Sequence, residues 1–235
     1  MGVFGPSIQA AFDIDDVVWP SIYMVGTLAS ALILPWTGKL IDQVDLRRYT
    51  LVVLIGFVFA CVVMASVQGV VMLIVAIFLL RQTGQGLMSH IAATSMARYH
   101  DDGRGRALAI ASLGESIGEA VLPILAALAI SWIGWRGGYF AVAFILVVVL
   151  IPLLFWLLKG HGARHEAFLA RRHMVRQATS ESARSATRGD MLRDPRFYLL
   201  LPGLLAPSMI TTALFIYHLK IADSKGWSDT WITGN

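Results

Sequence analysis

The sequence predicts an all-α membrane protein, built as a multi-pass helical bundle, and three observations support this fold class. Of its 235 residues, 57% are hydrophobic and 14% charged, with a mean hydropathy of +0.67. Soluble domains carry about 25% charged residues, so this composition favours an integral membrane protein. Apolar runs recur at about 20 residues, the length of helix that crosses a bilayer core. The net charge of +4 comes from basic loops between these runs, which argues against a nucleic-acid partner.

The first apolar stretch, residues 1–12, is too short to span a membrane. Twelve helical residues extend only about 18 Å, so we expect the second half of a truncated first helix. An acidic loop at 13–16 precedes a second span at 17–36. The third span, 49–68, is almost uniformly apolar and is therefore expected on the outside of the bundle. Further spans are predicted at 70–97, 107–133, 137–158 and 197–219. Gly134-Trp135-Arg136 closes the fifth span. The sixth span is uninterrupted apolar sequence and is again expected at the periphery of the bundle.

The spans divide the chain into three parts. Residues 1–158 form an N-terminal transmembrane half, and residues 159–196 form a polar central linker. Residues 197–235 contain the seventh span and the start of a second half that is truncated. The loops 38–48, 98–106 and 159–196 carry 15 of the 19 Lys and Arg residues. All three lie on one side by span parity, and the positive-inside rule makes that side the cytoplasm. We expect a plasma membrane, of the bacterial inner-membrane type.

The charged loop between the second and third spans resembles a known motif. Gly38, Leu40, Asp42 and Arg47-Arg48 fit the pattern Gly-x-Leu-x-Asp-Arg/Lys-x-Gly-Arg-Arg/Lys of the major facilitator superfamily, whereas Gln43 and Asp45 depart from it. The resemblance implies two six-helix halves joined by a central loop, with this chain covering the end of helix 1 through about helix 7. It also implies a conformational latch, in which Asp42 pairs with arginines such as Arg106.

Three charged residues fall inside the predicted spans, where each charge costs several kcal/mol unless it faces the bundle interior. Arg81 lies near the middle of the fourth span, and Glu115 and Glu119 lie one turn apart on the fifth. One interpretation is an anion-binding or proton-coupling site, with Gln85 and His90 as further polar contributors. The alternative is a permanent Arg–Glu pair that only joins two helices.

Two glycine motifs also resemble the superfamily. Arg81 with Gly84 and Gly86 is similar to its fourth-helix pattern Arg-x-x-Gln-Gly-x-Gly. Gly114, Gly118 and Pro123 are similar to a relaxed form of its fifth-helix Gly/Pro motif. Small residues four apart let helix backbones approach closely, so we expect this second set to pack against a neighbouring helix.

The leading functional prediction is a secondary active transporter of a small solute, moved by proton symport or by exchange. The central arginine favours a small organic anion, and Phe4-Gly5-Pro6, Arg81–Gly86 and Gly134-Trp135-Arg136 loosely resemble monocarboxylate/oxalate-type members. The expected partners are the solute, protons or a counter-ion, the lipid bilayer and the second half of the transporter. A multidrug or metabolite efflux antiporter and a non-transporting membrane scaffold remain alternatives.

Enzymatic chemistry has no support in the sequence. It contains neither a Gly-x-x-x-x-Gly-Lys-Ser/Thr phosphate loop nor a His-Glu-x-x-His zinc motif. The single cysteine, Cys61, lies inside an apolar run and cannot form an internal disulfide. We therefore expect a protein that is not an enzyme and that needs no cofactor or metal.

Overall fold

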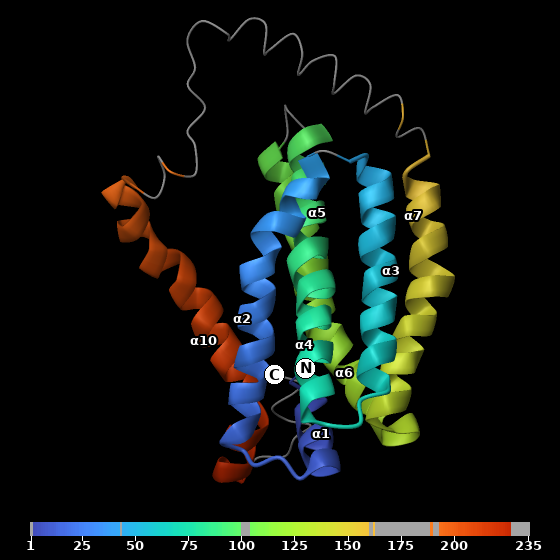
Figure 1. Ribbon diagram of the computed structural model, residues 1–235, viewed down its shortest axis with the longest axis vertical. Coiled ribbons are helices and arrows are strands. Elements are labelled where there is room, and N and C mark those ends of the chain that lie inside the picture. The colour runs from blue at the N-terminus through green and yellow to red at the C-terminus, as the bar shows by residue number, and fades with distance from the viewer. Residues whose placement is uncertain are drawn as a thin grey trace, which may run out of the picture. The chain divides into compact units, whose positions relative to one another are not determined.

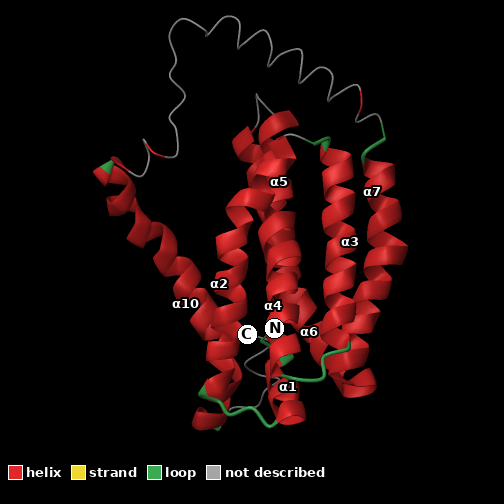
Figure 2. Cartoon of the chain, viewed as in Figure 1, coloured by secondary structure: helices red, strands yellow, loops and turns green. Residues whose placement is uncertain are grey.

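The computed structural model of the chain describes residues 2–42, 44–99, 104–159, 162, 189 and 193–226. Within these residues all regular secondary structure is helical (Figure 2), which confirms the predicted fold class. The chain forms two compact units, one of Pro6–Phe168 and one of Met1–Gly5 with Leu169–Asn235. The long helix of the second unit is α10 (Pro195–Lys225). The described helices of the first unit are α1 (Gly5–Phe12), α2 (Val18–Lys39), α3 (Leu46–Ala65), α4 (Val70–Leu80), α5 (Met88–Tyr99), α6 (Arg104–Ile145) and α7 (Ile151–Leu157). Three short helical turns connect some of them: the 3₁₀ turn η1 (Leu40–Asp42) and the π-helical turns η2 (Arg81–Leu87) and η3 (Leu146–Leu150).

Five helical segments of the described chain are long and apolar enough to cross a membrane: Val18–Lys39, Leu46–Ala65, Val70–Met96, Ala109–Leu157 and Pro195–Leu214. The fourth contains 49 residues, and at about 1.5 Å per residue such a helix far exceeds a bilayer core. The chain reverses inside it, at Gly134, where φ is 70° and ψ is 172°. Glycine lacks a Cβ and adopts this positive φ without steric cost. Ala109–Leu157 therefore holds two spans, which meet at the turn that the sequence predicted.

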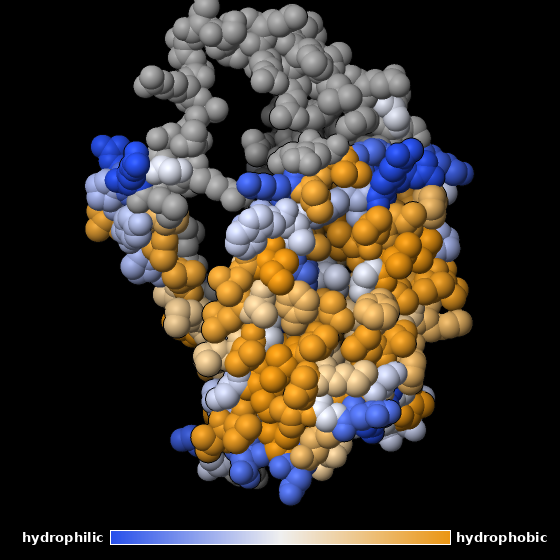
Figure 3. All heavy atoms as spheres, viewed as in Figure 1, coloured by the Kyte–Doolittle hydropathy of each residue, from blue (hydrophilic) through white to orange (hydrophobic). Residues whose placement is uncertain are grey.

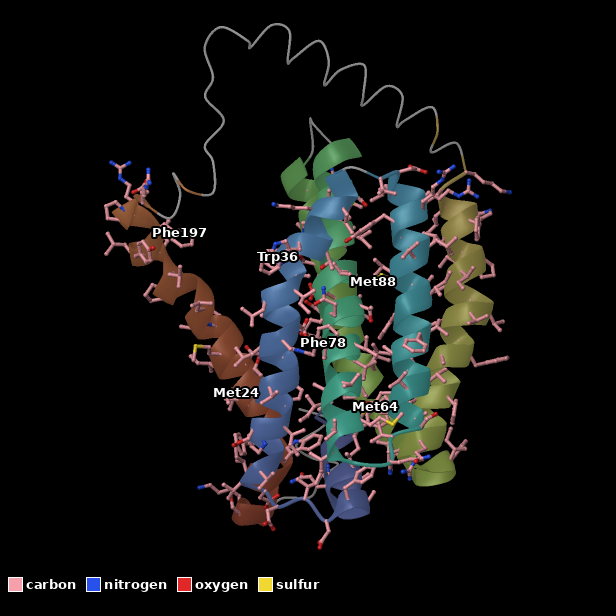
Figure 4. The ribbon with its side chains drawn as sticks, viewed as in Figure 1. Met24, Trp36, Met64, Phe78, Met88 and Phe197 are labelled. Carbon is pink, nitrogen blue, oxygen red and sulfur yellow. The ribbon has the colours of Figure 1, made fainter. Side chains whose placement is uncertain are left out.

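The helices of the first unit pack side by side (Figure 1). Helix α2 contacts α4 and η2, and α3 contacts α4 on one side and α6 on another. Met88 of α5 points toward α3 (Figure 4) and joins the two apolar clusters that hold this bundle together. One cluster links η1, α3, the end of η2 and α5 through Ile41, Leu46, Tyr49, Val53, Leu87 and Ile91. The other links α3 to α6 and η3 through Leu54, Cys61, Ala143 and Leu146.

Helix α3 differs from the expected position of the third span. It exposes only one face, which includes Val52 and Phe59, and buries the opposite face against α4 and α6. The expectation of an outer helix is therefore wrong for half of its surface. Uniform hydropathy could not reveal this, because lipid and protein interiors both favour apolar side chains. The sixth span behaves similarly, since it buries Tyr139, Ala143 and Leu146 and exposes Phe140 and Phe144.

Apolar side chains dominate the exposed surface of the spans in the first unit. Figure 3 shows them as an orange band, with polar residues gathered at the ends of the helices. Val52, Leu113 and Trp132 are among the exposed large apolar residues of the first unit. Such a surface suits contact with lipid tails or with further transmembrane helices.

Helix α10 contains the predicted seventh span, 197–219. It begins at Pro195, and the Asp194 carboxylate accepts a 2.9 Å hydrogen bond from the backbone N–H of Arg196. An acidic cap followed by proline at the first position is a typical helix start. Pro202 and Pro207 lie inside the helix, which is common in transmembrane helices. Most of the predicted linker 159–196 lies outside the described residues.

Candidate functional site

Arg81 begins the π-helical turn that interrupts the fourth span. Its guanidinium donates a hydrogen bond from Nη1 to the Oε1 of Gln85, one turn later. On the other side it lies 5.4 Å from the ring centroid of Tyr23 on α2. A π-helical turn inside an α-helix is uncommon and often marks a functional site. The structure thus brings together two predicted site residues, Arg81 and Gln85, and adds Tyr23 from a neighbouring helix.

Gln82 forms a buried polar network beside this arginine. Its Nε2 donates a 2.7 Å hydrogen bond to the hydroxyl oxygen of Thr37, and its Oε1 accepts a 2.9 Å bond from the hydroxyl of Ser30. Tyr49 of α3 joins the same region by donating a 2.9 Å bond to the backbone carbonyl of Thr37. The sequence analysis did not select Gln82, Ser30 or Thr37 as site residues. The sequence did contain one indication of this network: Ser30 and Thr37 are seven residues apart, which places both on one face of α2.

Glycines allow the close approach of the helices around η2. A Cβ added to Gly26 of α2 would lie 2.8 Å from Cγ2 of Ile77, and one added to Gly84 would lie 2.8 Å from the ring of Phe57. At Gly86 the nearest atom, Cδ1 of Leu34, would be 2.9 Å away. Because real Cβ atoms do not approach other atoms this closely, glycine at these three positions allows α2 to pack against α4 and η2, and α3 to pack against η2, at this distance.

The glycines of the fifth span behave differently. A Cβ at Gly114 would meet nothing within 4 Å, and one at Gly118 would meet only Leu122 of the same helix. Pro123 lies inside α6 and is half-buried. Among the described residues, Gly114 and Gly118 therefore make no close contact with a neighbouring helix, unlike Gly26, Gly84 and Gly86. The packing role of Gly114, Gly118 and Pro123 stays a prediction.

Glu115 and Glu119 are both exposed on α6 and lie one turn apart, as predicted from their spacing. In the described part of the chain neither carboxylate forms an ion pair with Arg81, whose contacts are Gln85 and Tyr23. The alternative of a permanent Arg–Glu pair joining two helices is thus not found in this structure. The described residues also contain no group of three or more His, Cys, Asp or Glu placed to hold a metal ion.

Comparison with known proteins gives one match. The sequence profile of the Major Facilitator Superfamily matches residues 1–234. The chain belongs to this superfamily. No curated protein and no solved structure matched it. Membership in this superfamily, together with the five apolar helical segments, makes the chain an integral membrane protein of a transporter family.

The charged loop that resembles the superfamily motif connects α2, η1 and α3. Gly38 is buried, and a Cβ there would lie 3.6 Å from the His90 ring on α5, so His90 adjoins this loop rather than Arg81. The guanidinium of Arg47 lies 4.8 Å from the ring centroid of Phe155 on α7. Arg48 and Arg106 are exposed. The side chain of Asp42 lies outside the described residues, so its role in the predicted latch stays a prediction.

A cluster at the opposite ends of the helices was not anticipated as a contact site. Arg136 donates a 2.9 Å hydrogen bond from Nη2 to the backbone carbonyl of Val67, in the turn between α3 and α4. Its guanidinium also lies 4.3 Å from the ring centroid of Trp135 and 5.8 Å from that of Phe12. In this superfamily member, the segment Gly134-Trp135-Arg136 thus ties the turn within α6 to α1 and to the α3–α4 turn.

Proposed function

We propose that the protein is a secondary active transporter of a small organic anion, such as a monocarboxylate, driven by a proton gradient or by exchange. The observation that carries this proposal is the environment of Arg81. Its two contacts, the Gln85 amide and the Tyr23 ring, are both uncharged. Neither contact supplies a counter-charge to the guanidinium at this mid-span position, and an anionic solute would supply one.

The chemistry of the guanidinium favours a carboxylate as that solute. Arginine presents a planar fork of N–H donors that matches two carboxylate oxygens, and such bidentate bonds are among the strongest in proteins. A charge inside a bilayer costs several kcal/mol unless it is paired. A carboxylate at Arg81 should therefore bind with a more favourable free energy than an uncharged solute of the same size.

Uptake measurements test the proposal directly. Vesicles carrying the full-length protein are supplied with labelled acetate, lactate or oxalate, with and without an inward proton gradient. We expect gradient-dependent or exchange-dependent uptake, and a KM at least about tenfold higher in Arg81→Gln, since a hydrogen bond to a charged group contributes about 1.5–3 kcal/mol. Arg81→Lys keeps the charge but loses the fork, so it should recover only part of the affinity.

Arg193→Gln provides the matched control, because Arg193 is exposed outside the predicted spans. Uptake that does not depend on Arg81 contradicts a binding role for this residue and leaves it a structural one. A correctly inserted protein that transports no carboxylate contradicts the anion assignment. A protein that tolerates neutralisation of Arg81 in every transport assay would instead fit a membrane scaffold.

The second candidate function is efflux of a cationic drug or metabolite in exchange for protons. The observation that favours it is the exposed pair Glu115 and Glu119 on α6. Two carboxylates one turn apart can hold a cation or exchange it for a proton. Efflux of ethidium that is lost in Glu115→Gln or Glu119→Gln, but kept in Arg81→Gln, would favour this function over anion transport.

We also propose that the loops 38–48, 98–106 and 159–196 face the cytoplasm of a plasma membrane, because they carry most of the basic residues. A Cys61→Ser background carrying either Arg48→Cys or Asp15→Cys tests this orientation. Both positions are exposed: Asp15 precedes α2, and Arg48 lies in the first turn of α3, beyond the loop that follows α2. An impermeant maleimide applied to intact cells should label the cysteine at position 15 and spare that at position 48; the reverse pattern would invert the topology.

A further inference from the structure

The first two residues of η2 contact the same helix, α2, through different groups. Arg81 places its guanidinium beside the ring of Tyr23, and Gln82 bonds to Ser30 and Thr37. Tyr23, Ser30 and Thr37 are each seven residues apart. At 3.6 residues per turn this spacing places them in one stripe along α2. The start of η2 is thus held against a single polar stripe.

The amide of Gln82 is the buried part of this contact. Only 6% of Gln82 and 5% of Ser30 are exposed. The amide donates to one hydroxyl and accepts from the other, so its orientation is determined by both bonds. Apolar packing has no such direction, and a leucine in the same place would tolerate rotation of η2 about its axis.

Rotation matters here because η2 is a π-helical turn. An α-helix turns by about 100° per residue, and a π-helical turn effectively accommodates one extra residue. If η2 relaxed to α-helix, the side chains on its two sides would turn relative to each other by about this angle. The guanidinium of Arg81 would then leave the ring of Tyr23, whereas Gln85 would stay within its reach, because residues four apart are neighbours in an α-helix as well.

We propose that Gln82 is a positioning residue for Arg81. Its two hydrogen bonds to α2 hold the start of η2 in the register that keeps the guanidinium beside Tyr23. The inference rests on the proposed role of Arg81 as the anion-binding group. It adds that substrate affinity depends on a buried amide that does not itself contact the substrate.

A transport measurement separates positioning from a purely structural role. In Gln82→Leu we expect the KM for the carboxylate to rise about tenfold, as for the loss of directed hydrogen bonds, with the maximal rate little changed. The triple variant Ser30→Ala, Thr37→Val, Gln82→Leu removes all polar partners together, which restores satisfied packing and hence stability. Its KM should stay raised; a return of the KM to the wild-type value along with stability would overturn the proposal.

A spectroscopic measurement does not depend on transport at all. The chain has six tyrosines, and 3-fluorotyrosine labelling gives each a ¹⁹F signal, with that of Tyr23 assigned by Tyr23→Phe. Arg81→Gln should shift the Tyr23 signal by removing the cation beside the ring. Gln82→Leu should move that signal toward the same value. Thr50→Val is the matched control, because the buried Thr50 hydroxyl bonds only within α3, to the carbonyl of Leu46.

The two measurements distinguish the possible failures. If the wild type moves no carboxylate, the proposed function fails, and the Tyr23 signal still decides whether Gln82 positions Arg81. If Arg81→Gln shifts that signal and Gln82→Leu does not, the positioning role is wrong whatever the uptake data show. A shift in Thr50→Val equal to that in Gln82→Leu would likewise overturn it, since it would reflect loosening of the whole bundle.

Discussion

The guanidinium of Arg136 donates a 2.9 Å hydrogen bond to the backbone carbonyl of Val67, 69 residues earlier in the chain. Val67 is fully buried, and it occupies the turn between α3 and α4. A buried backbone carbonyl in a turn has no partner within a helix, so a side-chain donor from elsewhere in the chain is a common solution. The bond therefore joins the turn after the third span to the turn between the fifth and sixth.

Loss of this bond should weaken the bundle. We expect Arg136→Gln to lower the free energy of unfolding by about 1–2 kcal/mol, less than a fully buried charged bond because Arg136 is itself exposed. The thermal-unfolding midpoint of the purified protein in detergent measures this change. Arg136→Lys should fall between wild type and Arg136→Gln, since lysine keeps the charge but stacks poorly on Trp135. An equal midpoint in Arg136→Gln and the control Arg193→Gln would show that the bond contributes nothing.

Gly26 and Gly114 should respond in opposite ways to alanine. At Gly26 the new Cβ would lie 2.8 Å from Cγ2 of the buried Ile77 and 3.1 Å from the backbone carbonyl oxygen of Ile74. Overpacking of this kind costs about 1–3 kcal/mol, so Gly26→Ala should lower the unfolding midpoint. At Gly114 the Cβ meets nothing, and helix propensity favours alanine by about 1 kcal/mol.

The same pair of variants tests the predicted packing role of Gly114. Unfolding midpoints measured side by side in detergent should show a loss for Gly26→Ala and none for Gly114→Ala. A loss at Gly114 as large as that at Gly26 would demonstrate a helix contact beyond those described. That result would restore the original interpretation of the fifth-helix glycines.

Arg47 and Phe155 should be energetically coupled. The guanidinium lies 4.8 Å from the ring centroid, and a cation–π contact at an exposed site contributes about 0.5–1 kcal/mol. A double-mutant cycle with Arg47→Gln and Phe155→Leu, measured by chemical unfolding in detergent, should return a coupling of this size. The matched cycle with Arg48→Gln should give additive effects within about 0.5 kcal/mol. Additive effects in both cycles would show that the contact between Arg47 and Phe155 contributes nothing to stability.

Thr27 should tolerate the loss of its hydroxyl. The oxygen of this hydroxyl is buried and has no hydrogen-bond partner among the described residues. Removing an unsatisfied polar group is neutral or stabilising, so Thr27→Val should keep or raise the unfolding midpoint. Thr50→Val is the control, because its hydroxyl donates a 2.7 Å bond to Leu46, and its loss should cost about 0.5–1.5 kcal/mol. A loss at Thr27 equal to that at Thr50 would show that its hydroxyl has a partner after all.

Hydropathy and charge spacing were sufficient to predict the all-α bundle, the helical spans and the reversal at Gly134-Trp135-Arg136. They were also sufficient to select Arg81, because a charge inside an apolar run stands out without any knowledge of neighbours. They could not distinguish Gln82 from Gln85. Both are polar residues in one span, and only the contacts of α2 show that Gln82 is buried whereas Gln85 is exposed beside Arg81.

The glycine motifs show the same limit. Spacing of four residues suggested close packing at Gly114 and Gly118, yet the close contacts occur at Gly26, Gly84 and Gly86. A glycine permits a close approach but does not require one, so the outcome depends on which helix lies opposite. The half-buried position of α3 followed from the same cause, since apolar side chains suit both lipid and protein neighbours.

The sequence by itself determined which segments are membrane helices, because burial of about 20 apolar residues is a property of each segment alone. It also determined the family, through a pattern that extends over residues 1–234. Only the tertiary structure decided which helix lies opposite Arg81 and Gln82: the guanidinium lies beside the Tyr23 ring of α2, and the Gln82 amide bonds to Ser30 and Thr37 of the same helix. Ser30 and Gln82 are 52 residues apart in the chain, so no local pattern could reveal the bond between them.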